Sequence, residues 1–228
     1  MTQSSNVQAL TKVFTEVDRK RIEAAVKQAE GQTSGEIVPY VVESSDLYEE
    51  AEWKASALLG LVVLLAFVLL HRLTEVWLPV DLLGATIAVV AAAVVGVLLA
   101  RHVYFLKRFF AGRKLMARRV HQRAVEAFVA EEVFDTNERT GILIFLSLVE
   151  HQVLVLGDSG INAKVQQHEW EGVVRVIIDS VKKGKVVDGL VTAIQQCGQL
   201  LQRQGVERRP DDKDELPDYL RIGDTPEP

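Results

Sequence analysis

Residues 55–70 read ASALLGLVVLLAFVLL, sixteen consecutive positions without a charged side chain. A second stretch of nineteen uncharged residues covers 82–100, after a link of eleven residues. An α-helix rises about 1.5 Å per residue and the hydrocarbon core of a bilayer is about 30 Å thick, so each stretch approaches the length of a transmembrane helix. We therefore predict a hairpin of two transmembrane helices at residues 53–72 and 77–100. A pair of buried helices in a soluble protein is the alternative, but such helices rarely run so long without a polar face.

The charges beside the hairpin predict its orientation. Residues 101–123 carry eight basic side chains and no acidic ones. Basic residues next to a span favour the cytoplasmic side, and two spans place both soluble segments on that side. We expect an integral membrane protein, of a bacterial inner membrane, with both termini in the cytoplasm. The basic residues expected at the membrane surface, with anionic lipid as their partner, are Arg101, Lys107, Arg108, Arg113 and Lys114.

Small residues recur at every fourth position of the second predicted span. They are Gly84, Ala88, Ala92, Gly96 and Ala100. Such a stripe allows helix backbones to approach closely. Two interpretations remain open, packing within the hairpin and a homo-oligomer interface.

The soluble segments alternate between patterns typical of helices and of strands. We expect helices at 16–30, 103–134, 165–183 and 186–204, and strands at 36–43, 141–148 and 152–156. The last two strands are close enough in sequence to form an antiparallel hairpin. Pro39 favours an edge position or a bulge for the first strand. The fold class expected is α/β, a small mixed sheet with helices packed on it, interrupted by the transmembrane hairpin.

These patterns divide the chain into five parts. A flexible N-terminus (1–11) precedes the first part of the α/β domain (12–52), which the hairpin (53–100) separates from the remainder (101–204). A tail (205–228) with four basic and eight acidic residues is expected to be disordered. The N-terminus lacks the basic start and apolar run of a signal peptide.

Several functions are disfavoured by the sequence. The single cysteine, Cys197, allows neither an internal disulfide nor the usual cysteine metal site. Phosphate-binding loops, dinucleotide-binding motifs and the HExxH motif do not occur, and we expect no nucleic-acid partner. Neither span has an ionisable residue at its centre, which argues against transport.

A Gly-Asp-Ser-Gly sequence at 157–160 follows the last predicted strand. In one interpretation it is a turn, with Asp158 accepting backbone hydrogen bonds and Gly160 free to adopt a positive φ. In the other, Asp158 lines a cleft at the end of the sheet. Arg139, Asp188 and Glu36 are the further candidates. Arginine can bind phosphate, and carboxylates brought together could hold Ca²⁺ or Mg²⁺.

Five segments resemble the TPM-domain family. They are FTE at 14–16 with Ile22 and Val26, TSGEIV at 33–38, RTGILI at 139–144, VLGDSGI at 155–161 and DGL at 188–190. The resemblance covers residues 12–205 apart from the hairpin, and implies a sheet flanked by helices. The family includes acid-phosphatase-like proteins of the thylakoid lumen and a regulator of acetylcholine receptors. The positions carried over from it are Asp158 and Asp188. Many relatives are exported and have a C-terminal anchor, whereas this chain has a hairpin inside the domain.

Two functions follow as expectations. The first is a membrane-anchored module that binds a membrane protein or complex at the cytoplasmic surface and assists or regulates it. The alternative is a metal-dependent phosphatase, with Asp158, Asp188 and Arg139 as catalytic residues and Asp158, Asp188 and Glu36 as metal ligands. The first is favoured because the sequence shows no strong pairing of a nucleophile with a base.

Overall fold

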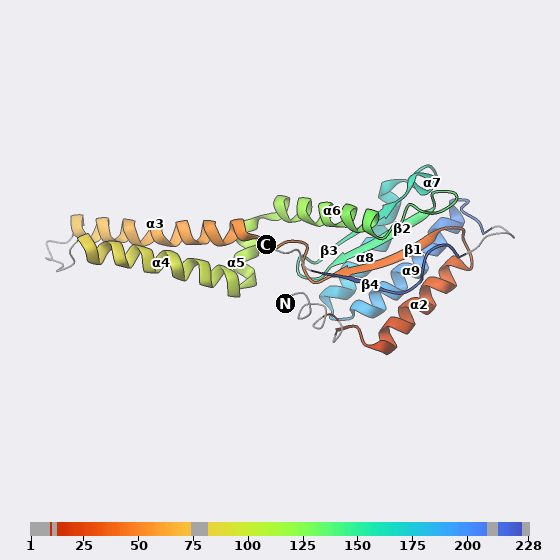
Figure 1. The fold of residues 1–228 in the computed structure, drawn as a ribbon, viewed down its shortest axis with the longest axis horizontal. Coiled ribbons are helices and arrows are strands. Elements are labelled where there is room, and N and C mark those ends of the chain that lie inside the picture. The colour runs from red at the N-terminus through yellow and green to blue at the C-terminus, as the bar shows by residue number, and fades with distance from the viewer. Residues whose placement is uncertain (1–9, 11–12, 74–81, 209–213, 225–228) are drawn as a thin grey trace. The chain divides into compact units, whose positions relative to one another are not determined.

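The structure, a computed structural model, describes residue 10 and residues 13–73, 82–208 and 214–224 (Figure 1). It comprises two compact units. The α/β unit contains residues up to 47 and from 117 onward, and the hairpin unit contains residues 48–116. Most of the predicted flexible N-terminus lies outside the described residues, but Leu10 is buried in the core of the α/β unit.

The first helix, α2 (Glu16–Glu30), begins where the sequence predicts. Thr15 and Asp18 form a capping box, because the Thr15 hydroxyl accepts the Asp18 amide and the Asp18 carboxylate accepts the Thr15 amide. Gly31 ends the helix, and the chain turns directly into strand β1 (Glu36–Val42). This tight connection brings the last residue of α2 beside the first residues of β1.

A four-stranded mixed sheet forms the centre of the α/β unit, in the order β3-β2-β1-β4. Its other strands are β2 (Gly141–Ser147), β3 (Gln152–Gly157) and β4 (Arg221–Gly223). β1 pairs in parallel with both β2 and β4, whereas β2 and β3 form the predicted antiparallel hairpin. The predicted fold class, a small mixed sheet with helices packed on it, is therefore confirmed.

Helices cover both faces of this sheet (Figure 1). One face packs on α2, α8 (Glu171–Lys182) and α9 (Val186–Arg203), with Ile144 at its centre. The other face packs on α6 (Arg113–Ala130), through residues such as Phe145. β2 is buried along its whole length, which explains why its sequence is continuously apolar.

Pro39 occupies the part of β1 that β4 does not reach, because the pairing with β4 begins at Tyr40. The Glu36 amide donates to Thr140 beside β2, so by alternation the nitrogen of Pro39 faces the opposite side. No ladder hydrogen bond is lost there. The edge position predicted for Pro39 thus holds for the first half of the strand.

Two predicted helices differ from those observed. The helix expected at 103–134 is divided into α5 (Tyr104–Ala111) and α6, because Gly112 adopts a φ of 76° between them. The helix expected to begin at 165 begins at 171. It is preceded by the short helix α7 (Ser159–Asn162) and the 3₁₀ turn η1 (Gln167–Trp170).

The prediction of a disordered tail is wrong for the residues that the structure describes. Residues 221–223 form β4, and the Arg221 guanidinium binds Glu131 at 3.0 Å and the Pro217 carbonyl at 2.8 Å. Leu216 and Leu220 are buried. The few apolar residues of the tail therefore dock on the domain, although its average composition is highly charged.

The hairpin unit is built from two long helices, α3 (Glu49–Leu73) and α4 (Leu82–His102). Both are long and apolar enough to cross a membrane by length and composition. They contain the predicted spans except residues 77–81, which lie outside the described residues. Gly96 and Ala100 are buried within the hairpin, and a Cβ on Gly96 would lie 2.8 Å from the Ala55 carbonyl oxygen. At this end the small-residue stripe packs inside the hairpin, whereas Ala88 is exposed.

Candidate functional site

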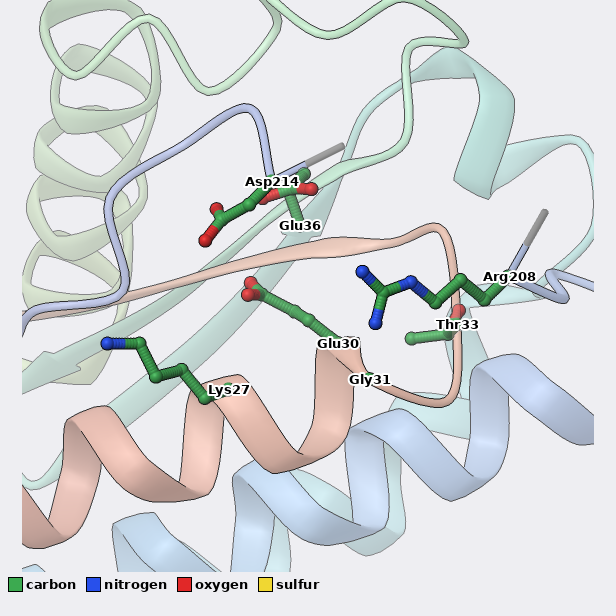
Figure 2. A pocket seen from close by; sticks show the side chains of 7 residues that line it. All are labelled: Lys27, Glu30, Gly31, Thr33, Glu36, Arg208 and Asp214. Atoms are coloured by element: carbon green, nitrogen blue, oxygen red, sulfur yellow. The ribbon is translucent and has the colours of Figure 1, made fainter. Parts of the chain in front are cut away.

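Three carboxylates meet in a small pocket of the α/β unit. Glu30, Glu36 and Asp214 each place a carboxylate oxygen within 4.8 Å of the other two. The cavity beside them has a volume of about 70 Å³ and is also lined by Lys27, Thr33 and Arg208. Figure 2 shows the three carboxylates directed into this cavity, with Lys27 and Arg208 on opposite sides. We refer to this group of residues as the acidic pocket.

The fold brings these carboxylates together from three parts of the chain. Glu30 ends α2, and its carboxylate accepts the Ile37 amide at 2.7 Å, which fixes it beside β1. Glu36 is the first residue of β1 and accepts the Leu216 amide of the tail at 3.2 Å. The tail that makes this contact also supplies Asp214. The acidic pocket is therefore complete only when the C-terminal tail is docked.

Burial makes negative charge costly in the acidic pocket. It raises the pKa of Glu36 to about 7. Burial, and then the neighbouring Asp218 side chain, raise the pKa of Glu30 to about 10. Burial also raises the pKa of Asp214. Carboxylates in such a setting are stabilised by binding either protons or a cation.

Basic groups neutralise only part of this charge. The Lys27 ammonium lies 2.9 Å from Glu23 and 3.5 Å from Asp218, two carboxylates that do not line the cavity. Asp218 is nearly buried, and one of its oxygens has no hydrogen-bond partner among the described residues. The oxygen-rich lining fits a hard divalent cation such as Ca²⁺ or Mg²⁺, which carboxylates and water can coordinate together.

The predicted residues Asp158 and Arg139 lie together but bind each other. The Arg139 guanidinium makes contacts of 2.7 and 3.2 Å with the two oxygens of Asp158, whose side chain is 8% exposed. Asp158 also caps α7 by accepting the Ser159 amide at 2.6 Å. These contacts agree with the turn interpretation of the Gly-Asp-Ser-Gly sequence.

Gly160 has a role that differs from the predicted one. Gly160 does not adopt a positive φ. A Cβ at this position would instead lie 2.2 Å from the Glu138 carbonyl oxygen, so the close approach of α7 to the backbone of Glu138 requires glycine.

The predicted residue Asp188 lies elsewhere. It occupies the first turn of α9 and forms an ion pair of 2.7 Å with Arg21 of α2. Arg21 precedes Glu30 by nine residues, a distance of about 13 Å along a helix. The Asp188 side chain is 57% exposed, which is usual for a surface ion pair.

The candidate residues from the sequence therefore do not form one site. Glu36 lies in the acidic pocket, whereas Asp158 and Asp188 are each paired with an arginine outside it. Sequence reasoning missed Glu30 and Asp214. Glu30 had one local signal, since an acidic residue at the C-terminal end of a helix is unfavourable for the helix dipole.

An α/β unit with a mixed four-stranded sheet between helices defines the class of fold. The NMR structure of the BA42 protein from the psychrophilic bacterium Bizionia argentinensis is similar in fold, with a TM-score of 0.56 and 21% sequence identity. The similarity covers 92% of this chain and 95% of that one. No curated protein matches the chain.

The family model of the TPM domain matches residues 109–200. The resemblance to the TPM-domain family found in the sequence is thereby confirmed. The matched segment contains Arg139, Asp158 and Asp188, whereas the three carboxylates of the acidic pocket lie outside it.

Proposed function

We propose that this chain is a membrane-anchored TPM-like module at the cytoplasmic surface of a bacterial inner membrane. The module binds a membrane protein or complex there and assists or regulates this partner. The observation that supports anchoring is the apolar surface of α3 and α4. Many large apolar side chains of the two helices are exposed, among them Leu65, Leu69, Leu82, Ile87 and Val90. A core helix of a soluble protein would be largely buried, whereas a helix surrounded by lipid leaves such side chains on its outer surface.

Extraction of membranes with alkaline carbonate tests the anchoring. We expect the full chain to stay in the membrane pellet. A variant with three charged substitutions on exposed apolar positions, Leu65→Lys, Leu69→Lys and Val90→Lys, should lose this property. Recovery of the unaltered chain in the supernatant would contradict the proposal.

The acidic pocket favours a second candidate function, binding of a divalent cation. Three carboxylate oxygens within 4.8 Å of one another, each on a group with a raised pKa, form a suitable set of ligands for Ca²⁺ or Mg²⁺. Glu36 is retained from the predicted metal ligands, whereas Asp158 and Asp188 are not needed. We expect calorimetric titration of the full chain in detergent to detect binding, and Glu36→Gln to weaken it at least tenfold. Asp188→Asn is the matched control and should leave binding unchanged.

Metal-dependent phosphatase activity remains the alternative function. Lys27 and Arg208 line the same cavity as the carboxylates and could attract a phosphate group. A metal in such a site would supply an activated water as nucleophile. Hydrolysis of a generic phosphomonoester that is lost in Glu36→Gln would favour this alternative. If activity is lost in Asp158→Asn and retained in Glu36→Gln, the originally predicted catalytic residues would be favoured instead. The module proposal predicts no turnover with either metal across a broad pH range.

A further inference from the structure

Two large aromatic side chains are exposed at the base of the hairpin unit. Trp53 lies in the second turn of α3 and is 73% exposed, and Phe109 lies in α5 and is 70% exposed. We propose that this base is a binding surface for anionic phospholipid headgroups, formed by Trp53 and Phe109 together with the exposed cations Arg101, Arg113 and Lys114. We call these five residues the collar. The inference rests on the proposed membrane anchoring and assigns the selection of anionic lipid to particular exposed side chains.

The packing of α5 explains why Phe109 is exposed. Ala111 is buried in a small core with Tyr48 and Ala51, and the half-buried Phe110 packs against the same core. The neighbouring Phe109 touches Phe110 edge-on, with ring centroids 5.3 Å apart, and otherwise faces outward. A short helix with one packed face and one exposed aromatic face at the end of a membrane span is typical of an interfacial helix. Tryptophan and phenylalanine there add apolar area at the level of the headgroups.

The basic side chains near this base fall into two groups. Lys107 forms an ion pair of 3.6 Å with Glu52, and Lys54 donates to the Phe110 carbonyl at 3.1 Å, so both contribute to packing within the unit. Of the other predicted membrane-surface residues, Arg101, Arg113 and Lys114 are exposed, and the side chain of Arg108 lies outside the described residues.

The position of these charges suits phospholipid headgroups. Arg101 directly follows the uncharged stretch of α4, so its guanidinium can reach the phosphate level of a bilayer. The acidic residues Glu49 and Glu50 precede Trp53 by about one turn of α3, further from the apolar stretch. Basic groups beside a membrane attract anionic lipid, with about a fivefold gain in association per side chain, and salt weakens the effect.

Quenching of tryptophan fluorescence by brominated lipid can measure this selection at the collar itself. The full chain carries tryptophans at 53, 77 and 170, and Trp170 is buried in the α/β unit. We would reconstitute the Trp77→Phe variant into vesicles containing brominated phosphatidylglycerol or brominated phosphatidylcholine at equal mole fraction. Quenching then reports which lipid is enriched beside Trp53.

We expect phosphatidylglycerol to quench several-fold more effectively than phosphatidylcholine at low salt, and the difference to shrink at high salt. The collar variant Arg101→Gln, Arg113→Gln, Lys114→Gln should lose most of this preference. The control variant Arg175→Gln, Lys183→Gln, Lys185→Gln changes the net charge equally at exposed positions of the α/β unit and should retain it.

The outcomes separate this inference from the anchoring on which it rests. Equal quenching by the two lipids, or an unchanged preference in the collar variant, would overturn the collar while leaving the anchoring intact. Absence of quenching by either lipid would overturn both, because Trp53 would then not lie in a bilayer.

Discussion

Replacing Glu36 with Gln removes one titrating carboxyl from the acidic pocket and keeps an oxygen that can accept the Leu216 amide. In the folded chain Glu36 keeps its proton up to about pH 7, whereas an unfolded chain releases it near its ordinary value of 4.5. The folded state therefore binds more protons between these values, and the free energy of unfolding falls as the pH rises through this range. The rise in the Glu36 pKa corresponds to about 3 kcal/mol.

We therefore expect Glu36→Gln to match the parent near pH 4 and to be more stable near pH 8 in the presence of a chelator, by up to about 3 kcal/mol. Calcium at a hundred times its dissociation constant should raise the stability of the parent by about 2.7 kcal/mol at pH 8, and that of Glu36→Gln by much less. Urea unfolding can follow the buried Trp170 in full chains that also carry Trp53→Phe and Trp77→Phe. Equal pH dependence of the parent and Glu36→Gln would refute the reasoning.

Three further predictions concern contacts outside the acidic pocket. Asp158→Asn weakens the contact with Arg139 and should lower the free energy of unfolding by about 1–2 kcal/mol, measured by urea unfolding, without changing calcium affinity in calorimetry. Gly96→Leu places a side chain into the backbone of the facing helix and should separate the two helices of the hairpin. We therefore expect a lower melting temperature in detergent. An unchanged melting temperature with a smaller oligomer would instead favour an intermolecular interface. Arg221→Ala removes the ion pair with Glu131 and should make the tail sensitive to limited proteolysis. Resistance to proteolysis equal to that of the parent would contradict a role of Arg221 in docking the tail.

The elements recovered from the sequence are those whose signal is local. The hairpin is defined by two uncharged stretches, α2 by its capping box, and β2 by a continuous apolar run that its two covered faces require. The break at Gly112 was missed because a helical pattern continues on both sides, and only a positive φ shows that the chain turns there.

The tail shows where average composition misleads. Its charge predicts disorder, but Leu216, Leu220 and Ile222 supply enough apolar surface to dock on a domain that already exists. A strand of three residues is sufficient to pair with the edge of β1 from Tyr40 to Val42.

The candidate site was harder to predict, because its residues converge through tertiary structure. Glu36 was identified at the start of a strand, but Asp214 is 178 positions away from it in the sequence. Asp158 directly follows β3 and Arg139 precedes β2, and their opposite charges bind each other. The sequence therefore shows which carboxylates the chain contains, but the fold determines which of them share a pocket.

Cysteine accessibility in intact bacterial cells tests the proposed topology most directly. The native Cys197 is fully buried and burial raises the pKa of its thiol, so it should stay unreactive in the folded chain. We expect a membrane-impermeant maleimide to label Glu75→Cys, between the two spans, in intact cells. Lys183→Cys, at an exposed position after α8, should be labelled only once the membrane is permeabilised. Labelling of Lys183→Cys in intact cells would contradict a cytoplasmic domain anchored by a transmembrane hairpin.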